Sequence, residues 1–176
     1  MTDRVTRPKL LDLFCCQGGA AMGYHRAGFD VVGVDIELQP NYPFEFVQAD
    51  AMLYAAIHGA EFDAIHASPP CQGETVLQFV NNNRDSHPRL IEPAREVLDG
   101  IGIPYVIENV VGAELKDPVR LCGEMFSLGV IRHRLFETNW PLEQPEHVKH
   151  RGRVRGWRHG HFYDGPYVAV CGRRRR

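Results

Sequence analysis

The sequence predicts an α/β fold in which helices cover both faces of a parallel β-sheet. Apolar runs of four to six residues, typical of buried strands, alternate along the chain with segments of helical pattern. Polar residues follow five of these runs, and in parallel sheets ligands bind beyond the carboxyl ends of the strands. A chain of 176 residues is expected to form one domain with a substantial core.

The first half of the chain predicts four strands and two helices. The strands are expected at residues 9–14, 31–35, 44–47 and 62–67. The helices are expected at residues 20–28, directly after a glycine turn, and at residues 51–58. Each strand is short and apolar enough to be buried on both of its faces.

The second half predicts one helix and two further strands. Pro88 opens an amphipathic helix, because apolar residues recur at helical spacing from Leu90 to Leu98. A fifth strand is expected at residues 104–107, and a sixth is expected to close at residues 135–136.

The composition divides the chain into a main domain, residues 1–142, and a basic C-terminal segment, residues 143–176. Within this segment, residues 144–166 predict a loop and residues 167–170 predict a late strand. Residues 149–176 contain nine Lys and Arg and one Asp, whereas the preceding part is acidic on balance. An acidic body with a basic end favours contact between the segment and a polyanion. A solvated tail is the alternative.

The cysteines predict reduced thiols rather than a disulfide framework, because they are odd in number and irregularly spaced. They are Cys15, Cys16, Cys71, Cys122 and Cys171. No Cys-x-x-Cys pair is present, which argues against a structural zinc site, and we assign no metal site. An alternative interpretation binds a metal through His147, His150, His159, His161 and Cys171, although basic histidine-rich loops are commonly plain polar surface.

Hydropathy argues against a membrane protein. No stretch approaches the about 18 consecutive apolar residues that a membrane span needs. Residues 1–9 are polar and lack the apolar run of a signal peptide. We therefore expect a cytoplasmic protein without a membrane partner.

The turn after the first strand and the acids at strand ends predict a cofactor site. Gly18 and Gly19 let the backbone approach a nucleotide-like ligand closely. Asp35 follows Asp12 by 23 residues, near the offset of about 20 at which a carboxylate holds ribose hydroxyls. Asp50 is placed to accept a hydrogen bond from an adenine amino group. Each acid alone is better explained as a helix cap or a surface charge, but the trio favours a cofactor.

The segment Pro69-Pro70-Cys71-Gln72 predicts a reactive thiol. Two prolines fix the backbone and remove two amide donors, so Cys71 is held rigidly where the fourth strand ends. A free cysteine is usually a small buried hydrophobe, which suits the other four. It suits Cys71 poorly, because a core thiol does not need a proline clamp in a loop.

Four segments in order give a specific resemblance to the DNA cytosine-5 methyltransferase family. Residues 12–29 resemble its cofactor-binding motif, and residues 69–72 resemble its Pro-Cys-Gln motif. Residues 108–110, Glu-Asn-Val, and 132–136, which begin Arg-His-Arg, resemble two further motifs. The short length of the sequence is similar to that of a short or truncated, phage-like member of the family. The resemblance implies a Rossmann-like methyltransferase sheet and DNA methylation, as in restriction-modification enzymes, in the cytoplasm of a bacterium or phage-infected cell.

The resemblance also implies a mechanism in which a thiolate adds to carbon 6 of a cytosine flipped out of duplex DNA, activating carbon 5 for methylation. Glu108 would hold the ring nitrogen and the amino group, Arg134 the carbonyl oxygen, and Arg132 would order the pocket. The implied catalytic residues are Cys71, Glu108, Arg132 and Arg134. The implied S-adenosylmethionine-binding residues are Asp12, Phe14, Gly18, Gly19, Asp35, Ile36, Asp50, Ala51 and Pro69.

The chain departs from the family at several positions. Val130 stands where a glutamine is usual, Cys16 replaces a glycine, and Glu74 with Thr75 replaces an aromatic-serine pair. Family members continue with a long target-recognition region and a helix that returns to the cofactor pocket, whereas about 40 residues follow Phe136 here. We therefore expect a minimal enzyme, a truncated one, or one in which a second chain completes the cofactor or DNA site. Transfer RNA methylation and a catalytically weak binding protein are the alternative functions.

Overall fold

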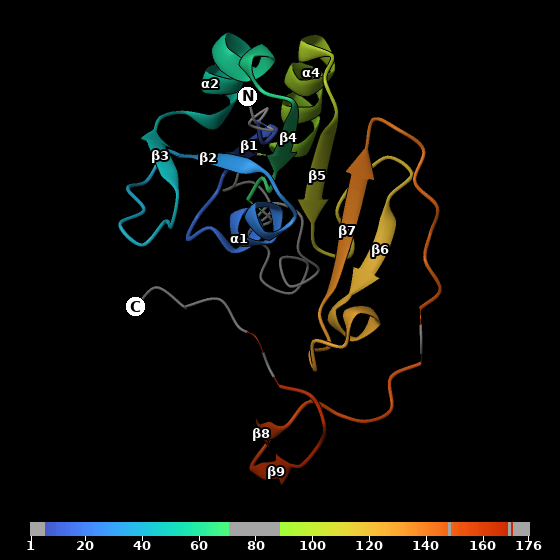
Figure 1. Ribbon diagram of the computed structural model, residues 1–176. Helices are drawn as coiled ribbons and strands as arrows, with labels where there is room; N and C mark the ends of the chain where they lie inside the picture. The colour runs from blue at the N-terminus through green and yellow to red at the C-terminus, as the bar shows by residue number, and fades with distance from the viewer. Residues whose placement is uncertain (1–5, 71–88, 148, 169, 171–176) are drawn as a thin grey trace, which may run out of the picture.

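The computed structural model describes residues 6–70, 89–147, 149–168 and 170. Its centre is a seven-stranded sheet in the order β3-β2-β1-β4-β5-β7-β6 (Figure 1). The strands are β1 (Lys9–Leu13), β2 (Asp30–Asp35), β3 (Glu45–Gln48), β4 (Ala64–Ala67), β5 (Tyr105–Asn109), β6 (Val119–Cys122) and β7 (His133–Thr138). The helices are α1 (Gly19–Arg26), α2 (Ala51–His58) and α4 (Ile91–Ile101), with 3-10 turns η1 (Gly59–Glu61) and η4 (Gly123–Phe126). None of the described helices is long and apolar enough to cross a bilayer.

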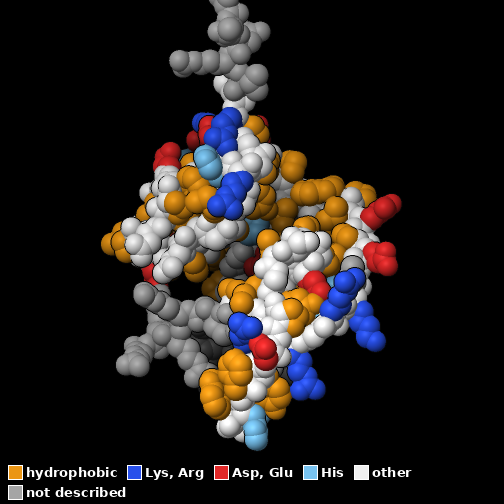
Figure 2. All heavy atoms as spheres, turned by 60° about the horizontal axis from the view of Figure 1, so that its bottom comes forward, with side chains coloured by type: hydrophobic (Ala, Val, Ile, Leu, Met, Phe, Trp, Pro, Cys, Tyr) orange, Lys and Arg blue, Asp and Glu red, His pale blue; other side chains and the backbone are white. Residues whose placement is uncertain are grey.

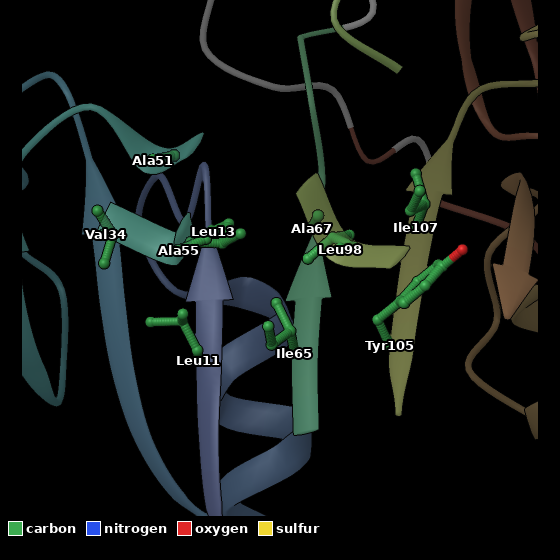
Figure 3. Close-up of a cluster of buried hydrophobic side chains, with 10 residues drawn as sticks. All are labelled: Leu11, Leu13, Val34, Ala51, Ala55, Ile65, Ala67, Leu98, Tyr105 and Ile107. Carbon is green, nitrogen blue, oxygen red and sulfur yellow. The ribbon is translucent and has the colours of Figure 1, made fainter. Parts of the chain in front are cut away.

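The alternation of side chains along β1 explains why helices cover both faces of the sheet. Leu11 and Leu13 point to one face, where they join a buried cluster with residues of α2 and α4, such as Ala55 and Leu98 (Figure 3). Leu10 points to the other face, in a second buried cluster to which α1 contributes. Figure 1 accordingly shows α2 and α4 together on one side of the sheet and α1 on the other.

The strands from β3 to β5 are parallel, as predicted, but the far end of the sheet is not. β7 pairs antiparallel with β5, and β6, which the sequence did not predict, pairs antiparallel with β7. β6 was missed because its four residues, Val-Arg-Leu-Cys, alternate apolar and polar only once. An all-parallel sheet was therefore wrong for this edge.

The C-terminal segment also differs from the prediction of a loop. A hairpin of β8 (Gly156–Arg158) and β9 (His161–Tyr163) interrupts residues 144–166 and lies apart from the main sheet (Figure 1). The strand expected at residues 167–170 is absent from its described positions. Tyr167 and Val168 instead make single bridges to Val154 and Val130, because no strand of the described residues runs beside them.

A buried ion pair fixes β7 against α4. Arg95 and Glu137 are each 2% exposed, and the guanidinium binds the carboxylate through two nitrogens, with Nη2 2.8 Å from Oε2. The same carboxylate accepts a hydrogen bond from the amide of Lys116, while Arg95 also donates to the carbonyl of Glu114. A bidentate pair with its remaining groups satisfied offsets the cost of removing both charges from water.

Replacement of Glu137 should therefore destabilise the fold strongly. Glu137→Gln keeps the side-chain volume but leaves the guanidinium of Arg95 without its buried counter-charge, at an expected cost of about 3 kcal/mol in the free energy of unfolding. Asp164→Asn, which breaks the exposed ion pair with Arg155, should cost less than about 1 kcal/mol. Urea denaturation of the two variants measures the difference, and equal costs would contradict the assigned role of the buried pair.

Candidate active site

A cavity of about 1170 Å³ opens at the edge where the parallel strands end. One wall comes from the turn after β1 and from α1, and the opposite wall from β5, β6 and β7. Because β7 is antiparallel to β5, the first residues of β7 reach the same edge as the last residues of β5. The lining residues are Asp12, Phe14, Cys15, Cys16, Gly19, Ala20, Gly23, Tyr24, Ala27, His66, Ser68, Glu108, Leu121, Phe126, Arg132, Arg134 and Phe136.

The glycine turn gives the cavity a bare backbone wall. Gly18 has a φ of 79°, and a Cβ at this position would lie 2.7 Å from Cδ of Pro43, so a side chain would be excluded. Gly19 begins α1, lines the cavity and has no atom within 4 Å of the position of a Cβ. The first amides of a helix have no partner within the helix, so this turn can present N–H groups to a ligand.

Asp12 lies below this turn, at the floor of the cavity. Its side chain is 1% exposed, and Tyr42 Oη donates a hydrogen bond to Oδ2 over 3.3 Å. Burial raises the pKa of Asp12 to about 7, with a smaller upward contribution from the charge of Asp35, while the Tyr42 hydrogen bond lowers it. Asp12 therefore changes charge near neutral pH within reach of whatever the cavity binds.

Asp35 and Ile36 lie at the end of β2, beside the cavity rather than in its wall. The carboxylate of Asp35 accepts hydrogen bonds from the amides of Cys16, at 3.0 Å, and Glu37, at 2.9 Å. Asp35 thereby braces the glycine turn, and a carboxylate has lone pairs for further donors such as hydroxyls. Ile36 is 68% exposed, so an apolar surface lies open beside the carboxylate.

Asp50 and Ala51 stand at the start of α2. Asp50 is the N-cap, and its Oδ1 accepts hydrogen bonds from the amides of Met52 and Leu53 at 3.0 and 2.9 Å. The side chain of Ala51 is buried in the core, so only its backbone could meet a ligand. The helix-cap explanation considered for Asp50 thus holds structurally, and its role toward an adenine stays a prediction.

Glu108 and Arg134 face each other across the β5–β7 junction. Nε of Arg134 lies 2.7 Å from Oε1 of Glu108, and the two side chains are 26% and 20% exposed. Both line the cavity, as does Arg132, whose Nη1 donates to the carbonyl of Val170 over 2.8 Å. The structure thus brings together three of the four residues predicted to be catalytic.

The fourth, Cys71, lies outside the described residues, but the chain leading to it is held firmly. Pro69 is buried, and its carbonyl accepts a hydrogen bond of 3.0 Å from Nδ2 of Asn109. Asn109 is 2% exposed, and its Oδ1 accepts from the amide of Val110 over 2.9 Å. Asn109 therefore couples the Pro-Pro segment to the end of β5, next to Glu108.

A polar relay in the cavity floor was not predicted from the sequence. Nδ1 of His66 lies 3.0 Å from Oη of Tyr24, and Nε2 lies 2.8 Å from Oγ of Ser68. All three residues line the cavity. Burial lowers the pKa of His66 to about 4, so the ring is neutral at physiological pH. The signal available in the sequence was a histidine inside an apolar strand, whose burial requires hydrogen-bonding partners.

Comparisons with known proteins bear on the fold. No protein-family model and no curated protein sequence matches the chain. Among solved structures, the Dnmt2 methyltransferase of S. pombe is similar, with 16% identity and a TM-score of 0.53, over 78% of this chain and 52% of that one. A SAM-dependent methyltransferase from Agrobacterium tumefaciens shows 20% identity and a TM-score of 0.36, over 60% and 39% of the two chains.

The likeness to the S. pombe protein confirms the predicted fold class, a Rossmann-like methyltransferase sheet covered by helices. At 16% identity it shows the fold alone, and the chain spans about half the length of that protein.

His66 should impose a specific pH dependence on stability. Its pKa is about 4 when folded and near 6.5 when unfolded, so its stabilising contribution is complete above pH 6.5 and is lost as the pH falls to 4. His66→Gln cannot titrate. Between pH 7 and pH 5 the natural protein should therefore lose about 2 kcal/mol more unfolding free energy than the variant. Chemical denaturation at the two pH values measures this, and parallel losses would contradict a buried neutral His66.

Proposed function

We propose that this chain is an S-adenosylmethionine-dependent methyltransferase that methylates carbon 5 of cytosine in DNA through a covalent adduct with Cys71. The observation that carries the proposal is one cavity with two unlike walls. A glycine turn forms one wall, and the Glu108–Arg134 pair forms the other. The methyltransferase fold and the order of the sequence motifs support it.

The cavity fits a cofactor and a base together. Its volume of about 1170 Å³ exceeds the range of about 300–1,000 Å³ typical of sites for a single small ligand. On the α1 side, Gly19 and Gly23 leave open space, and Phe14 offers an apolar surface. The amides of the turn and the carboxylates of Asp12 and Asp35 suit the polar groups of a nucleoside. S-adenosylmethionine would lie along this wall and extend past its rim, its ribose toward Asp35 and its adenine beside Ile36 and Asp50.

The opposite wall fits the polar edge of cytosine. Cytosine presents an amino group that donates, and a ring nitrogen and a carbonyl oxygen that accept. The carboxyl group of Glu108 would hold the amino group and N3, and the guanidinium of Arg134 would donate to the carbonyl oxygen. Their separation of 2.7 Å without substrate keeps both groups at the same place in the cavity. This prior ordering reduces the reorganisation needed when a base enters.

The reaction would then proceed by addition of Cys71 to the base, methylation, and elimination of Cys71. The Cys71 thiolate adds to carbon 6, and the electron pair of the ring double bond moves toward N3, where Glu108 holds the proton. S-adenosylmethionine, held by the glycine turn and Asp35, would supply the methyl group to carbon 5 and keep the electrons of the broken bond on its sulfur. A base removes the proton from carbon 5, the double bond forms again, and Cys71 leaves as the thiolate. Arg132 orders this wall, and Asn109 positions the Cys71 segment through Pro69.

The β8–β9 hairpin supports a nucleic-acid partner. Trp157 is 75% exposed and Phe162 is 52% exposed, with ring centroids 5.7 Å apart. Arginines flank them in the sequence, and the guanidinium of Arg153 lies over the ring of Tyr163. Exposed aromatic rings among basic side chains suit stacking on bases beside charged phosphates. On the face shown in Figure 2, apolar side chains of the described residues lie among both basic and acidic ones.

The decisive test is trapping of the covalent adduct. Duplex DNA that contains 5-fluorocytosine, incubated with the chain and S-adenosylmethionine, should give a stable protein–DNA species, because fluorine cannot leave as the carbon 5 proton does. Mass spectrometry should locate the base on Cys71. Cys71→Ser should abolish the adduct, and Glu108→Gln should slow its formation by at least about 100-fold, the usual scale of lost acid–base catalysis.

The matched control is Cys171→Ser, which removes a thiol of the C-terminal segment and should leave adduct formation unchanged. An RNA stem with the same base separates the substrates, since an adduct formed with RNA and not with DNA would assign the chain to RNA. Absence of any adduct despite S-adenosylmethionine binding would overturn the catalytic proposal in favour of a binding protein.

A further inference from the structure

We propose that Cys122, His133, His147 and His150 bind one zinc ion on the side of β7 that faces away from the cavity. One ligand atom from each of the four residues lies within 4.8 Å of the other three. This group comes from parts of the chain that are up to 28 positions apart in the sequence. Convergence of one thiol and three imidazoles is therefore a property of the fold, not of a local motif.

Secondary structure positions the four residues. Cys122 ends β6 and His133 begins β7, and the two are directly paired across the antiparallel ladder. The connection between them, which contains η4, packs closely at Gly123, where a Cβ would lie 2.8 Å from the carbonyl oxygen of Val130. His147 and His150, three positions apart, follow on the chain that returns after β7. A hairpin and a short His-x-x-His segment thus supply two ligands each, a common division in zinc sites.

The geometry of the three rings cannot be explained by hydrogen bonds among them. Nε2 of His133 lies 3.0 Å from Nε2 of His147 and 3.3 Å from Nε2 of His150. A ring nitrogen carries either one hydrogen or one lone pair, so a single nitrogen cannot serve both neighbours. A shared cation satisfies all three lone pairs at once. Tetrahedral coordination at a Zn–N distance of 2.0–2.1 Å separates the nitrogens by about 3.3 Å, close to these values.

The fourth ligand and the surroundings favour zinc. Cys122 is 2% exposed, and its sulfur accepts a hydrogen bond from the amide of Met125, as metal-bound thiolates can. The contact of 4.0 Å between the sulfur and the carbonyl of Val130 is too long to be a strong hydrogen bond. A donor set of one thiolate and three imidazoles favours zinc, because calcium and magnesium bind mainly oxygen ligands. Four protein ligands leave no open position, so the site is structural rather than catalytic.

A carboxylate completes the arrangement. Nδ1 of His150, the nitrogen turned away from the cluster, contacts a carboxylate oxygen of Glu124, and Tyr167 donates its hydroxyl hydrogen to the other oxygen. Metal-bound histidines characteristically donate their second N–H to a carboxylate in this way, which fixes the tautomer and the ring orientation. The negative charge of Glu124, together with the Cys122 thiolate, balances the two positive charges of zinc.

The site would stiffen the wall of the cavity. Along β7 successive side chains alternate between faces, so His133 would bind the metal while Arg134 lines the cavity, as does Arg132 directly before the strand. Leu121 lines the cavity directly before Cys122 on β6. Through His147 and His150 the metal also ties the C-terminal segment to the β6–β7 hairpin. Zinc is therefore a positioning element for the arginines and has no contact with the reacting atoms.

Metal content tests the proposal independently of methyl transfer. The chain, expressed without a histidine tag in zinc-supplemented medium, should contain about one zinc per molecule by plasma mass spectrometry. Cobalt exchanged into the site should give the intense visible absorption and thiolate charge-transfer band of a tetrahedral centre with sulfur. Removal of zinc by a chelator should lower the thermal midpoint, and zinc should restore it.

Matched histidine variants distinguish this cluster from unspecific binding. His133→Ala and Cys122→Ser should each lower zinc content to below about a tenth of the natural level and remove the cobalt bands. His159→Ala and His161→Ala, at the β8–β9 hairpin outside the cluster, should leave both unchanged. Where a variant fails to fold, the cobalt spectrum of the natural chain alone decides, and a spectrum without tetrahedral or thiolate bands overturns the site.

Discussion

The antiparallel pairing of β7 with β5 is the constraint on which the rest of the site depends. Because β7 runs opposite to β5, Arg134, early in β7, lies beside Glu108, late in β5. The register is fixed away from the cavity, where Glu137 is locked to Arg95 inside the core. Since side chains alternate along a strand, a shift of one residue would turn Arg134 out of the cavity and destroy the buried ion pair together. Stability and the placement of the arginine are therefore set by one alignment.

In the cavity formed by this alignment, the two halves of the sheet have different proposed roles. The parallel half of the sheet carries the glycine turn, braced by Asp35, which suits a cofactor that must be held by backbone. The antiparallel half carries charged side chains that suit recognition of a base. Asn109 joins the halves, because it ends β5 and holds the carbonyl of Pro69 after β4. The proposed zinc site would reinforce the antiparallel half from the face opposite the cavity.

Much of this was predictable from the sequence, for a definite reason. Buried parallel strands are short apolar runs, so the strands from β1 to β5 were found, and the acids at their ends followed from topology. β6 and the β8–β9 hairpin were missed because these strands are too short to show the apolar–polar alternation of a strand or a continuous apolar run. The proposed zinc cluster shares only His147 and His150 with the metal alternative considered from the sequence, and Cys122 and His133 join them through the pairing of β6 with β7. Long-range pairing of antiparallel strands leaves no local pattern in the sequence.

Identification of the methylated atom tests the central claim most directly. DNA incubated with the chain and methyl-labelled S-adenosylmethionine can be digested to nucleosides and analysed by mass spectrometry. A cavity in which Glu108 and Arg134 hold the polar edge of cytosine leaves the opposite, carbon 5 side of the ring toward the cofactor wall. Label is therefore expected in 5-methylcytosine alone, and none with Cys71→Ser. Label on an exocyclic amino group, or transfer that persists without Cys71, would contradict it.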